Sequence, residues 1–339
     1  MVIKMNQKPL LTIAIPTYNG GKTIRNMLDL LLPQCNDCRV EILISDNCST
    51  DNTESIIASY KEKWNGIIYH RNKVNIGPDA NFLQCMKLAE GTFTWLVSDD
   101  DIVIEGAVEK ILRFLEDHKD VGLVYLTTRD FRGRYISPEK CTVHKPEVEE
   151  DLCTKDKIEF MRYAGAYWGF MSSYICNTER FRRIAEPEKY YETYWLQSYI
   201  HALCAKGKGT WLGVVKGPCV GAGIYVNSAN FDSSIVNGAY YKKMIDFMIR
   251  EADFDKAQLL SMYKKRLLHL LRHDIIKEKA SGIKKVSKKR VLEETYFYPM
   301  AWVTLYPLLI IPNCICRETM RIYRKRLDMK EPIRINRPE

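Results

Sequence analysis

Short apolar runs alternate with amphipathic stretches along the first hundred residues. Runs rich in β-branched residues occur at 10–16, 40–45, 66–70 and 94–97, and each predicts a buried strand. Apolar residues at helical spacing predict helices over 22–33, 52–63 and 79–89. This alternation, with a repeat of roughly 30 residues, is typical of an α/β fold. We therefore predict a doubly wound, mainly parallel sheet flanked by helices.

The pattern is less regular after residue 120. It predicts strands at 121–126 and 211–215, a helix at 198–207, an irregular loop at 130–160 and a glycine-rich turn at 217–223. From about residue 237 helical spacing takes over. The chain is thus expected to form two domains, an α/β domain over 1–236 and a helical, basic region over 237–339.

Three consecutive carboxylates, Asp99, Asp100 and Asp101, follow the apolar run that ends at Val97. Adjacent negative charges repel, so a bound cation would stabilise them, and Mg²⁺ and Mn²⁺ prefer such oxygen ligands. Ligands of open α/β sheets also bind at the carboxyl ends of strands. The alternative is a solvated acidic turn before the helix that starts near Glu105.

The other polar loops also follow strands, so the same edge of the sheet is expected to carry Tyr18, Asp46, Asn47 and Asn75. No Gly-x-Gly-x-x-Gly follows the first strand, which argues against a dinucleotide dehydrogenase. The P-loop pattern is absent as well, which argues against that class of NTPase. A phosphate-bearing ligand at this edge would therefore need a metal ion.

Four segments resemble the motifs of family 2 glycosyltransferases, which have the GT-A fold. They are Ile13–Asn19, Glu41–Asp51, Asn75–Gly77 and Ala89–Asp101, and their order and spacing match over about residues 10–130. The Asp-Asn pair and the Asn-Ile-Gly-Pro-Asp-Ala-Asn-Phe stretch are similar to a bacterial, abequosyltransferase-like branch of surface-polysaccharide enzymes. The resemblance implies a metal-dependent transferase that moves a sugar from a nucleotide diphosphate sugar to a hydroxyl of a glycan or a polyprenyl-linked glycolipid.

The resemblance also implies roles for single residues. Asp100 and Asp101 would bind Mn²⁺ or Mg²⁺, which stabilises the leaving nucleoside diphosphate. Asp46 and Asn47 would read the base, and because an amide donates as well as accepts, Asn47 argues against uridine and leaves cytidine or thymidine open. The full set of implied nucleotide-binding residues is Pro16, Tyr18, Asn19, Asp46, Asn47, Asn75 and Asp99.

The acceptor side is less well marked. Trp168, Ser172 and Ser173 lie in a segment that would face the sugar and acceptor, although a core strand is the alternative. Inverting members use a carboxylate base before a helix in the second half of the domain. Their Glu-Asp pair is absent here, and Glu192 is the nearest carboxylate, with a solvated acid at a helix start as the alternative. Without a base the enzyme would be retaining.

The C-terminal third differs in charge. Residues 241–330 carry 21 Lys and Arg against 10 Asp and Glu, whereas residues 1–240 carry 28 against 30. An uncharged aromatic run at 296–312 is interrupted by Pro299, Pro307 and Pro312, so a straight membrane span is not expected. Aromatic residues with flanking basic residues favour contact of 242–326 with an anionic membrane surface, and a buried helical hairpin is the alternative.

The same observations bear on the other functional classes. A nucleic-acid binder is not expected, because that role leaves the apolar run unexplained. A nucleotide-sugar or glycan-binding module that has lost catalysis is the alternative to a transferase, favoured by the missing Glu-Asp pair. Met1–Lys8 is polar and carries no signal peptide, and eleven cysteines lack a framework pattern. We therefore expect a cytoplasmic protein, peripheral on the inner face of the plasma membrane.

Overall fold

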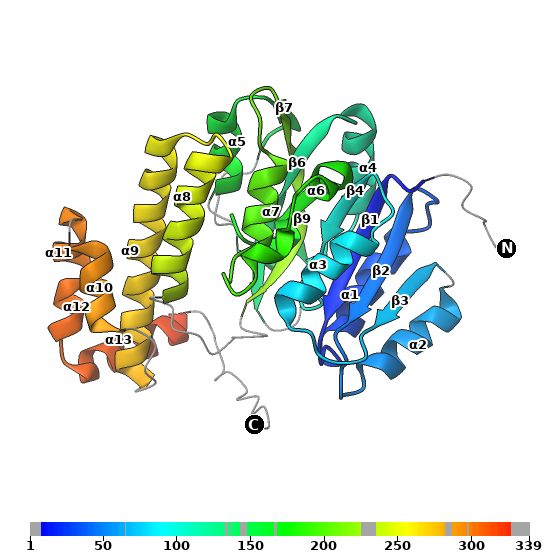
Figure 1. Ribbon diagram of the computed structural model, residues 1–339. Helices are drawn as coiled ribbons and strands as arrows, with labels where there is room; N and C mark the ends of the chain where they lie inside the picture. The colour runs from blue at the N-terminus through cyan, green and yellow to red at the C-terminus, as the bar shows by residue number, and fades with distance from the viewer. Residues whose placement is uncertain are drawn as a thin grey trace. The chain divides into compact units, whose positions relative to one another are not determined.

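The fold is described from a computed structural model of the full chain (Figure 1). The residues that the structure describes are 8–64, 66–132, 135, 137–142, 148–165, 168–224, 235–281, 287–296 and 298–326. Part of the predicted loop 130–160, Tyr167, and the basic pair Lys284 and Lys285 lie outside these residues.

The first half of the sheet is parallel, as predicted. Strands β1 (Leu11–Thr17), β2 (Val40–Asp46), β3 (Ile67–Arg71) and β4 (Phe93–Leu96) stand in the order β3-β2-β1-β4. Helices α1 (Ile24–Leu31), α2 (Thr53–Lys63) and α3 (Pro78–Leu88) connect them. Every residue of β1, β2 and β4 is buried, which explains their continuous apolar character. Because all four strands run the same way, their carboxyl ends meet at one edge.

The second half of the sheet is mixed. Strand β8 (Tyr174–Asn177) pairs antiparallel with both β4 and β6 (Val121–Arg132), and β6 pairs parallel with β9 (Trp211–Ile224). Strands β5 (Ile102–Val103) and β7 (Leu152–Thr154) pair antiparallel with β9. The alternation of strand and helix that predicts parallel pairing stops after β4, and the antiparallel pairs lie beyond that point.

Helices and short 3₁₀ turns cover this sheet. Helix α3 packs on β1, β2 and β4, while α4 (Ala107–Asp117) packs on β9. The core between sheet and helices is built from Ile, Leu, Val and aromatic residues, with Trp95 fully buried. The remaining helices of this part are α5 (Lys157–Ala164), α6 (Thr178–Arg182), α7 (Leu196–Cys204) and the 3₁₀ turns η1 (Leu32–Gln34), η2 (Pro138–Lys140), η4 (Met171–Ser173) and η5 (Pro187–Tyr190).

Two predictions in this region were wrong. The glycine-rich stretch 217–223 is not a turn but part of strand β9, where Gly221 pairs with Ile102 of β5 and Arg129 of β6. The loop predicted to begin at residue 130 begins later, because β6 continues to Arg132, and 152–164 contains β7 and α5. In both cases backbone pairing between β9 and its neighbouring strands orders residues whose composition is typical of loops.

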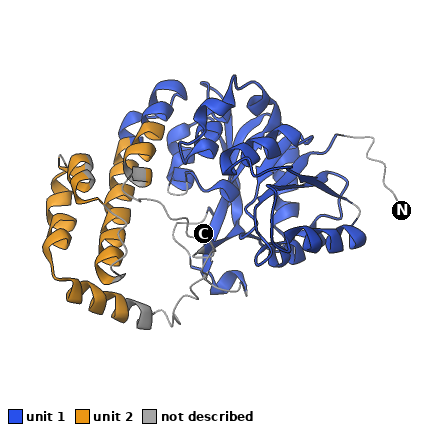
Figure 2. Cartoon of the chain, turned by 60° about the horizontal axis from the view of Figure 1, so that its bottom comes forward, with its two compact units in different colours: residues 1–229, 246–259 blue, residues 230–245, 260–339 orange. Residues whose placement is uncertain are grey.

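The chain forms two compact units (Figure 2). The first contains residues 1–229 and 246–259, and the second contains residues 230–245 and 260–339. The predicted boundary at 236/237 stays a prediction. The C-terminal third is helical, as the spacing indicates, and contains the π-helix η6 (Ile235–Tyr240) and helices α8 (Tyr241–Glu251), α9 (Lys256–Ser281), α10 (Lys288–Thr295), α11 (Pro299–Thr304), α12 (Tyr306–Ile310) and α13 (Asn313–Arg326).

In the described part of the chain, no single helix is long and apolar enough to cross a membrane. The pair Pro299–Ile310 and Asn313–Ile322 meets the length and composition of a span, with a bend of 105° at the break.

Candidate active site

The acidic turn lies at the carboxyl end of β4. Asp99 is buried, and its carboxylate accepts a hydrogen bond from the Thr17 hydroxyl at the end of β1. Burial is the largest influence on this carboxyl, and the charges of Asp100 and Asp51 add to it, so its pKa rises to about 7. A Cβ at position 20 would lie 2.1 Å from Asp99 Oδ2, so a larger residue there would displace this carboxylate. The β1 loop therefore closes directly over Asp99.

Asp101 is held entirely by the protein. Its Oδ2 accepts a hydrogen bond from Ser172 Oγ at 2.6 Å, and its Oδ1 accepts one from Gly223 N at 2.9 Å. Burial, followed by the charge of Asp100, raises its pKa well above the usual range. Asp101 joins the acidic turn to the segment before β8 and to the end of β9. A metal-ligand role for Asp101 stays a prediction, and the contacts favour a role in fixing the turn.

Asp100 is the most accessible of the three carboxylates. It is half-buried, and its Oδ1 accepts a hydrogen bond from Ser98 Oγ at 2.5 Å. Asp99 and Asp101 are 7% and 2% exposed. Among the described residues, no three His, Cys, Asp or Glu side chains are grouped to hold a metal ion. A cation here would therefore complete its shell with phosphate oxygens and water, which is common for Mg²⁺.

Asp46 and Asn47 lie at the end of β2, and both side chains are buried. Asp46 accepts hydrogen bonds from Ser49 N at 2.8 Å and from Tyr69 Oη at 2.7 Å. Asn47 Nδ2 donates to Asn75 Oδ1 at 2.7 Å and to Gly77 O at 3.2 Å.

The carbonyl side of Asn47 is also satisfied. Its Oδ1 accepts hydrogen bonds from Asn72 Nδ2 at 3.1 Å and from Ile76 N at 2.9 Å. All four hydrogen bonds available to this amide are thus made within the protein. Recognition of the nucleotide base by Asn47 stays a prediction. Its four hydrogen bonds show that this residue holds loop 72–77 in place.

The other predicted nucleotide residues surround the same edge. Pro16 is buried within β1 opposite Ser45, whereas Tyr18 is 46% exposed in the loop that follows. Asn19 is exposed, and its φ of 53° places it in the left-handed region, which Asn tolerates. Its backbone N donates to Ser49 Oγ at 2.9 Å, which links the β1 and β2 loops. The exposed Asn75 belongs to the β3 loop.

The segment expected on the acceptor side is buried instead of exposed. Trp168, Ser172 and Ser173 are 1%, 0% and 0% exposed. Trp168 packs edge-on against Tyr174 with ring centroids 5.3 Å apart, and Ser173 Oγ lies 3.0 Å from Thr128 Oγ1. These residues form no strand, since 171–173 is a 3₁₀ turn before β8. These buried residues would affect a bound sugar only indirectly, by fixing the position of other residues, above all Asp101.

Glu192 lies in the loop formed by residues 186–195, and its side chain is exposed. Its backbone N donates to Asp79 Oδ2 at 2.8 Å, at the start of α3. Burial, with the nearby Glu192 carboxylate, raises the pKa of Asp79. The two carboxylates are thus neighbours. Sequence reasoning missed Asp79, although its place just after Asn75-Ile76-Gly77-Pro78 marks it as the first turn of a helix that begins at the strand ends.

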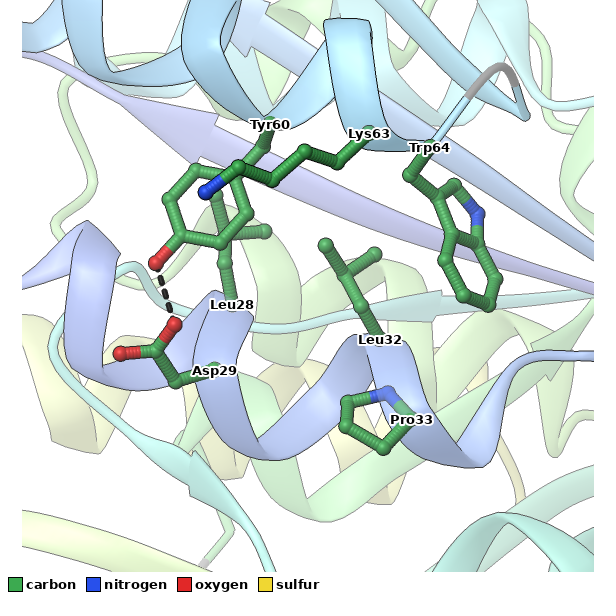
Figure 3. A pocket seen from close by; sticks show the side chains of 7 residues that line it. All are labelled: Leu28, Asp29, Leu32, Pro33, Tyr60, Lys63 and Trp64. Atoms are coloured by element: carbon green, nitrogen blue, oxygen red, sulfur yellow. Dashed lines mark hydrogen bonds between the residues drawn. The ribbon is translucent and has the colours of Figure 1, made fainter.

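A separate pocket of about 200 Å³ lies between α1, η1 and α2 (Figure 3). The hydroxyl of Tyr60 donates to Asp29 at one end, and Trp64 stands at the other. None of the predicted site residues lines this pocket. The lining residues are Leu28, Asp29, Leu32, Pro33, Tyr60, Lys63 and Trp64.

Comparison with known proteins gives a consistent result. The sequence model described as "Glycosyl transferase family 2" matches residues 12–176. Abequosyltransferase RfbV of Salmonella typhimurium is 26% identical over 250 residues, which cover 70% of this chain and 72% of that protein. Poly(ribitol-phosphate) beta-N-acetylglucosaminyltransferase TarS of Staphylococcus aureus is 30% identical over 139 residues, but the match covers only 24% of its length.

Solved structures show the same fold. A TarS fragment of residues 1–349 superimposes with a TM-score of 0.57 at 16% identity, covering 96% of this chain and 94% of that one. A mannosyltransferase from Pyrobaculum calidifontis, solved with GDP-Man and Mn²⁺, gives 0.53 at 15% identity, covering 95% and 89%. The predicted GT-A architecture is confirmed by these matches.

Proposed function

We propose a specific reaction for this glycosyltransferase, whose residues 12–176 match the sequence model described as glycosyl transferase family 2. The enzyme transfers a sugar from a nucleotide diphosphate sugar to a hydroxyl of a glycan or polyprenyl-linked glycolipid in bacterial surface-polysaccharide synthesis, and it depends on Mn²⁺ or Mg²⁺. The observation that carries the proposal is the acidic turn after β4, in which two carboxylates are buried and hydrogen-bonded and Asp100 is the more accessible one.

The chemistry of this turn suits a divalent cation. Its donors are hard carboxylate oxygens. Burial first, and the neighbouring carboxylates second, raise the pKa of Asp99, and a cation would stabilise its ionised form. In our proposal Asp100 binds the metal, and the metal when bound stabilises charge on the leaving diphosphate. Asp99 and the loops after β1, β2 and β3 hold the nucleoside. The remaining residues of the turn fix its backbone.

Glu192 is proposed as the general base of an inverting transfer. Its carboxylate accepts the proton of the acceptor hydroxyl while the acceptor oxygen bonds to the anomeric carbon. The bond from that carbon to the phosphate oxygen breaks, and its electron pair leaves with the nucleoside diphosphate. Exposure of Glu192 supports this role, because a base must reach a substrate in solution.

Thermal-shift measurements with UDP, CDP, GDP and dTDP, each with and without Mn²⁺, test the donor site. We expect one nucleotide to raise Tm only when the metal is present, because a ligand that binds the folded state stabilises it by mass action. Asp100→Ala should lose this shift, and Asp120→Ala, which removes an exposed carboxylate on the loop after α4, should keep it. Equal shifts in both variants would contradict the metal-ligand assignment.

We also propose that the C-terminal region 242–326 binds an anionic membrane surface from the cytoplasmic side. Its described part exposes large apolar residues, with Ile310 84%, Val303 68% and Trp302 59% exposed. Residues 296–316 carry no charge, and basic residues flank them. Lys279 Nζ donates to Leu308 O and Leu309 O at 3.0 and 2.9 Å, which ties the end of α12 to α9.

Vesicle pelleting tests this second proposal. Wild-type protein should pellet with vesicles containing anionic phospholipid and not with neutral phosphatidylcholine vesicles. Trp302→Ser should weaken pelleting several-fold, whereas Trp211→Ser, at a 40% exposed tryptophan on β9, should not. Equal pelleting of both variants, or binding to an oligonucleotide instead of vesicles, would contradict membrane docking through this surface.

A further inference from the structure

Loop 186–195 is tied to helix α3 at two points. Near the start of the helix, Asp79 Oδ2 accepts the hydrogen bond from Glu192 N. Near its end, Lys87 Nζ lies 2.5 Å from Glu188 Oε1. The Lys87 and Glu188 side chains are 52% and 46% exposed, so water and salt screen this ion pair. Asp79 is more enclosed, and its contact is the stronger constraint on the loop.

The loop needs such a constraint because its backbone is strained. Glu192 and Tyr194 both have φ of 60°, in the left-handed region that non-glycine residues seldom adopt. Residues in that region keep their conformation only where surrounding contacts impose it. Asp79 accepts its hydrogen bond from the amide of Glu192 itself, so the contact acts at a strained residue.

Just after the loop, Gln197 of α7 is hydrogen-bonded to the segment that supports the acidic turn. Gln197 Nε2 donates to Gly169 O at 2.8 Å. Position 169 admits only glycine, because its φ is 104° and a Cβ would lie 2.3 Å from the Trp195 ring. Three residues later, Ser172 donates to Asp101. The backbone around Glu192 is thus fixed from α3 on one side and from the acidic turn on the other.

We propose that Asp79 is a positioning residue that holds Glu192 for proton transfer from the acceptor hydroxyl. The inference rests on the proposed function, in which Glu192 is the base. Asp79 itself does not take the proton. Asp79 lies on helix α3 and supports Glu192 from there. In a Glu-Asp pair, an acidic residue beside the base in sequence would give this support. Removal of its side chain would release the strained backbone and move the Glu192 carboxylate away from its working position.

Four variants test this inference. Asp79→Ala removes the acceptor of the Glu192 amide, whereas Asp79→Asn keeps an oxygen that can accept the same bond. Glu192→Gln removes the proposed base. Glu188→Gln removes the charge of the exposed ion pair at the far end of α3 and serves as the matched control.

The first readout does not depend on activity. Hydrogen exchange at the Glu192 amide should accelerate in Asp79→Ala and stay close to wild type in Asp79→Asn and Glu188→Gln. Unchanged exchange in Asp79→Ala would overturn the inference, whatever the enzyme turns over.

The second readout is turnover of UDP-, GDP-, CDP- and dTDP-linked sugars with water as acceptor, measured as released nucleoside diphosphate. For the best donor, kcat of Asp79→Ala should fall about 10- to 100-fold, part of the usual contribution of a general base. Its KM should stay within about twofold, since donor binding is not affected. Asp79→Asn should recover most of kcat.

The outcomes distinguish a failure of the proposed function from a failure of the positioning role of Asp79. A wild-type protein that hydrolyses no donor would contradict the proposed function, while amide exchange would still decide whether Asp79 holds the loop. Full turnover in Glu192→Gln would overturn Glu192 as base and Asp79 as its support. Full turnover in Asp79→Ala alone, with Glu192→Gln inactive, would overturn only the positioning role.

Discussion

The loops proposed to face the nucleotide and the loop that carries Glu192 are stabilised in different ways. On the nucleotide side, Asn47, Asn72 and Asn81 are buried and bond to one another, to Ser45 and to the backbone. Loop 186–195 has three non-glycine residues at positive φ, Glu186, Glu192 and Tyr194, while the loops after β1 and β2 have two, Asn19 and Cys48. Each such residue costs on the order of 1–3 kcal/mol.

We expect the two sides to tolerate substitution differently. The nucleotide side is a closed amide network in which each change leaves a buried group without a partner. Loop 186–195 is held by the Asp79 contact and by the buried rings of Tyr190 and Trp195, so we expect its exposed positions to be the ones that can change. The first arrangement favours a fixed donor site, and the second favours a variable acceptor site.

The largest expected effect is on turnover, from a substitution in the acidic turn that leaves stability almost unchanged. Asp100→Ala should lower donor turnover by about 100-fold or more, because stabilisation of the leaving group is lost. Its free energy of unfolding should change little, because the side chain is half-buried and its partner Ser98 is next to it. Urea unfolding and turnover on the same preparations measure both quantities.

Asp101→Ala is the matched comparison. It leaves Gly223 N and the Ser172 hydroxyl without their acceptor, so we expect a loss of about 2–4 kcal/mol in the free energy of unfolding. If Asp100→Ala were the more destabilised variant, the assignment of metal ligand and structural carboxylate would have to be reversed.

Asn47→Asp tests the amide network and should have the next largest effect. An ionised Asp cannot donate to Asn75 Oδ1 or Gly77 O, and it would place a negative charge beside both oxygens. We expect the free energy of unfolding to fall by about 1–3 kcal/mol. Nucleotide binding should weaken as well, because loop 72–77 loses its support.

The exposed Asn313→Asp is the control, with an expected change below about 0.5 kcal/mol. A stable Asn47→Asp variant that binds a different nucleotide more tightly would instead favour direct base reading by this residue.

Sequence reasoning succeeded where local pattern and tertiary structure agree. Strands β1, β2 and β4 are buried on both faces, so their continuous apolar runs located them to within one or two residues. The acidic turn was found because three adjacent carboxylates need an explanation. The roles within the turn were not separable, because Asp101 owes its burial to Ser172 and Gly223, which are 71 and 122 residues away in sequence.

The same limit explains the other errors. Gly217–Gly223 has the composition of a turn, but pairing with β5 and β6 makes it a strand. Asp79 appears in the sequence as an ordinary first-turn acid, and its relation to Glu192 spans 113 residues. Contacts of this range depend on how the second half of the sheet folds back on the first, and no local spacing encodes them.

The smallest predicted effect falls on the side of the molecule that carries Glu192. His201 on α7 is buried against Trp168 and Tyr174, and its Nδ1 has no hydrogen-bond partner among the described residues. Burial lowers its pKa from 6.5 to about 3, so the unfolded chain binds the proton more readily than the folded one. The stability that depends on neutral His201 is complete above pH 6.5 and is lost as the pH falls towards 3, which amounts to about 2 kcal/mol at pH 5. His201→Phe keeps a ring and removes the titration, so the loss of unfolding free energy between pH 8 and pH 5 should be about 2 kcal/mol smaller than in wild type. Urea unfolding of both proteins at the two pH values measures these losses. If the variant and the wild type lost the same free energy, acid would not act through His201 on α7.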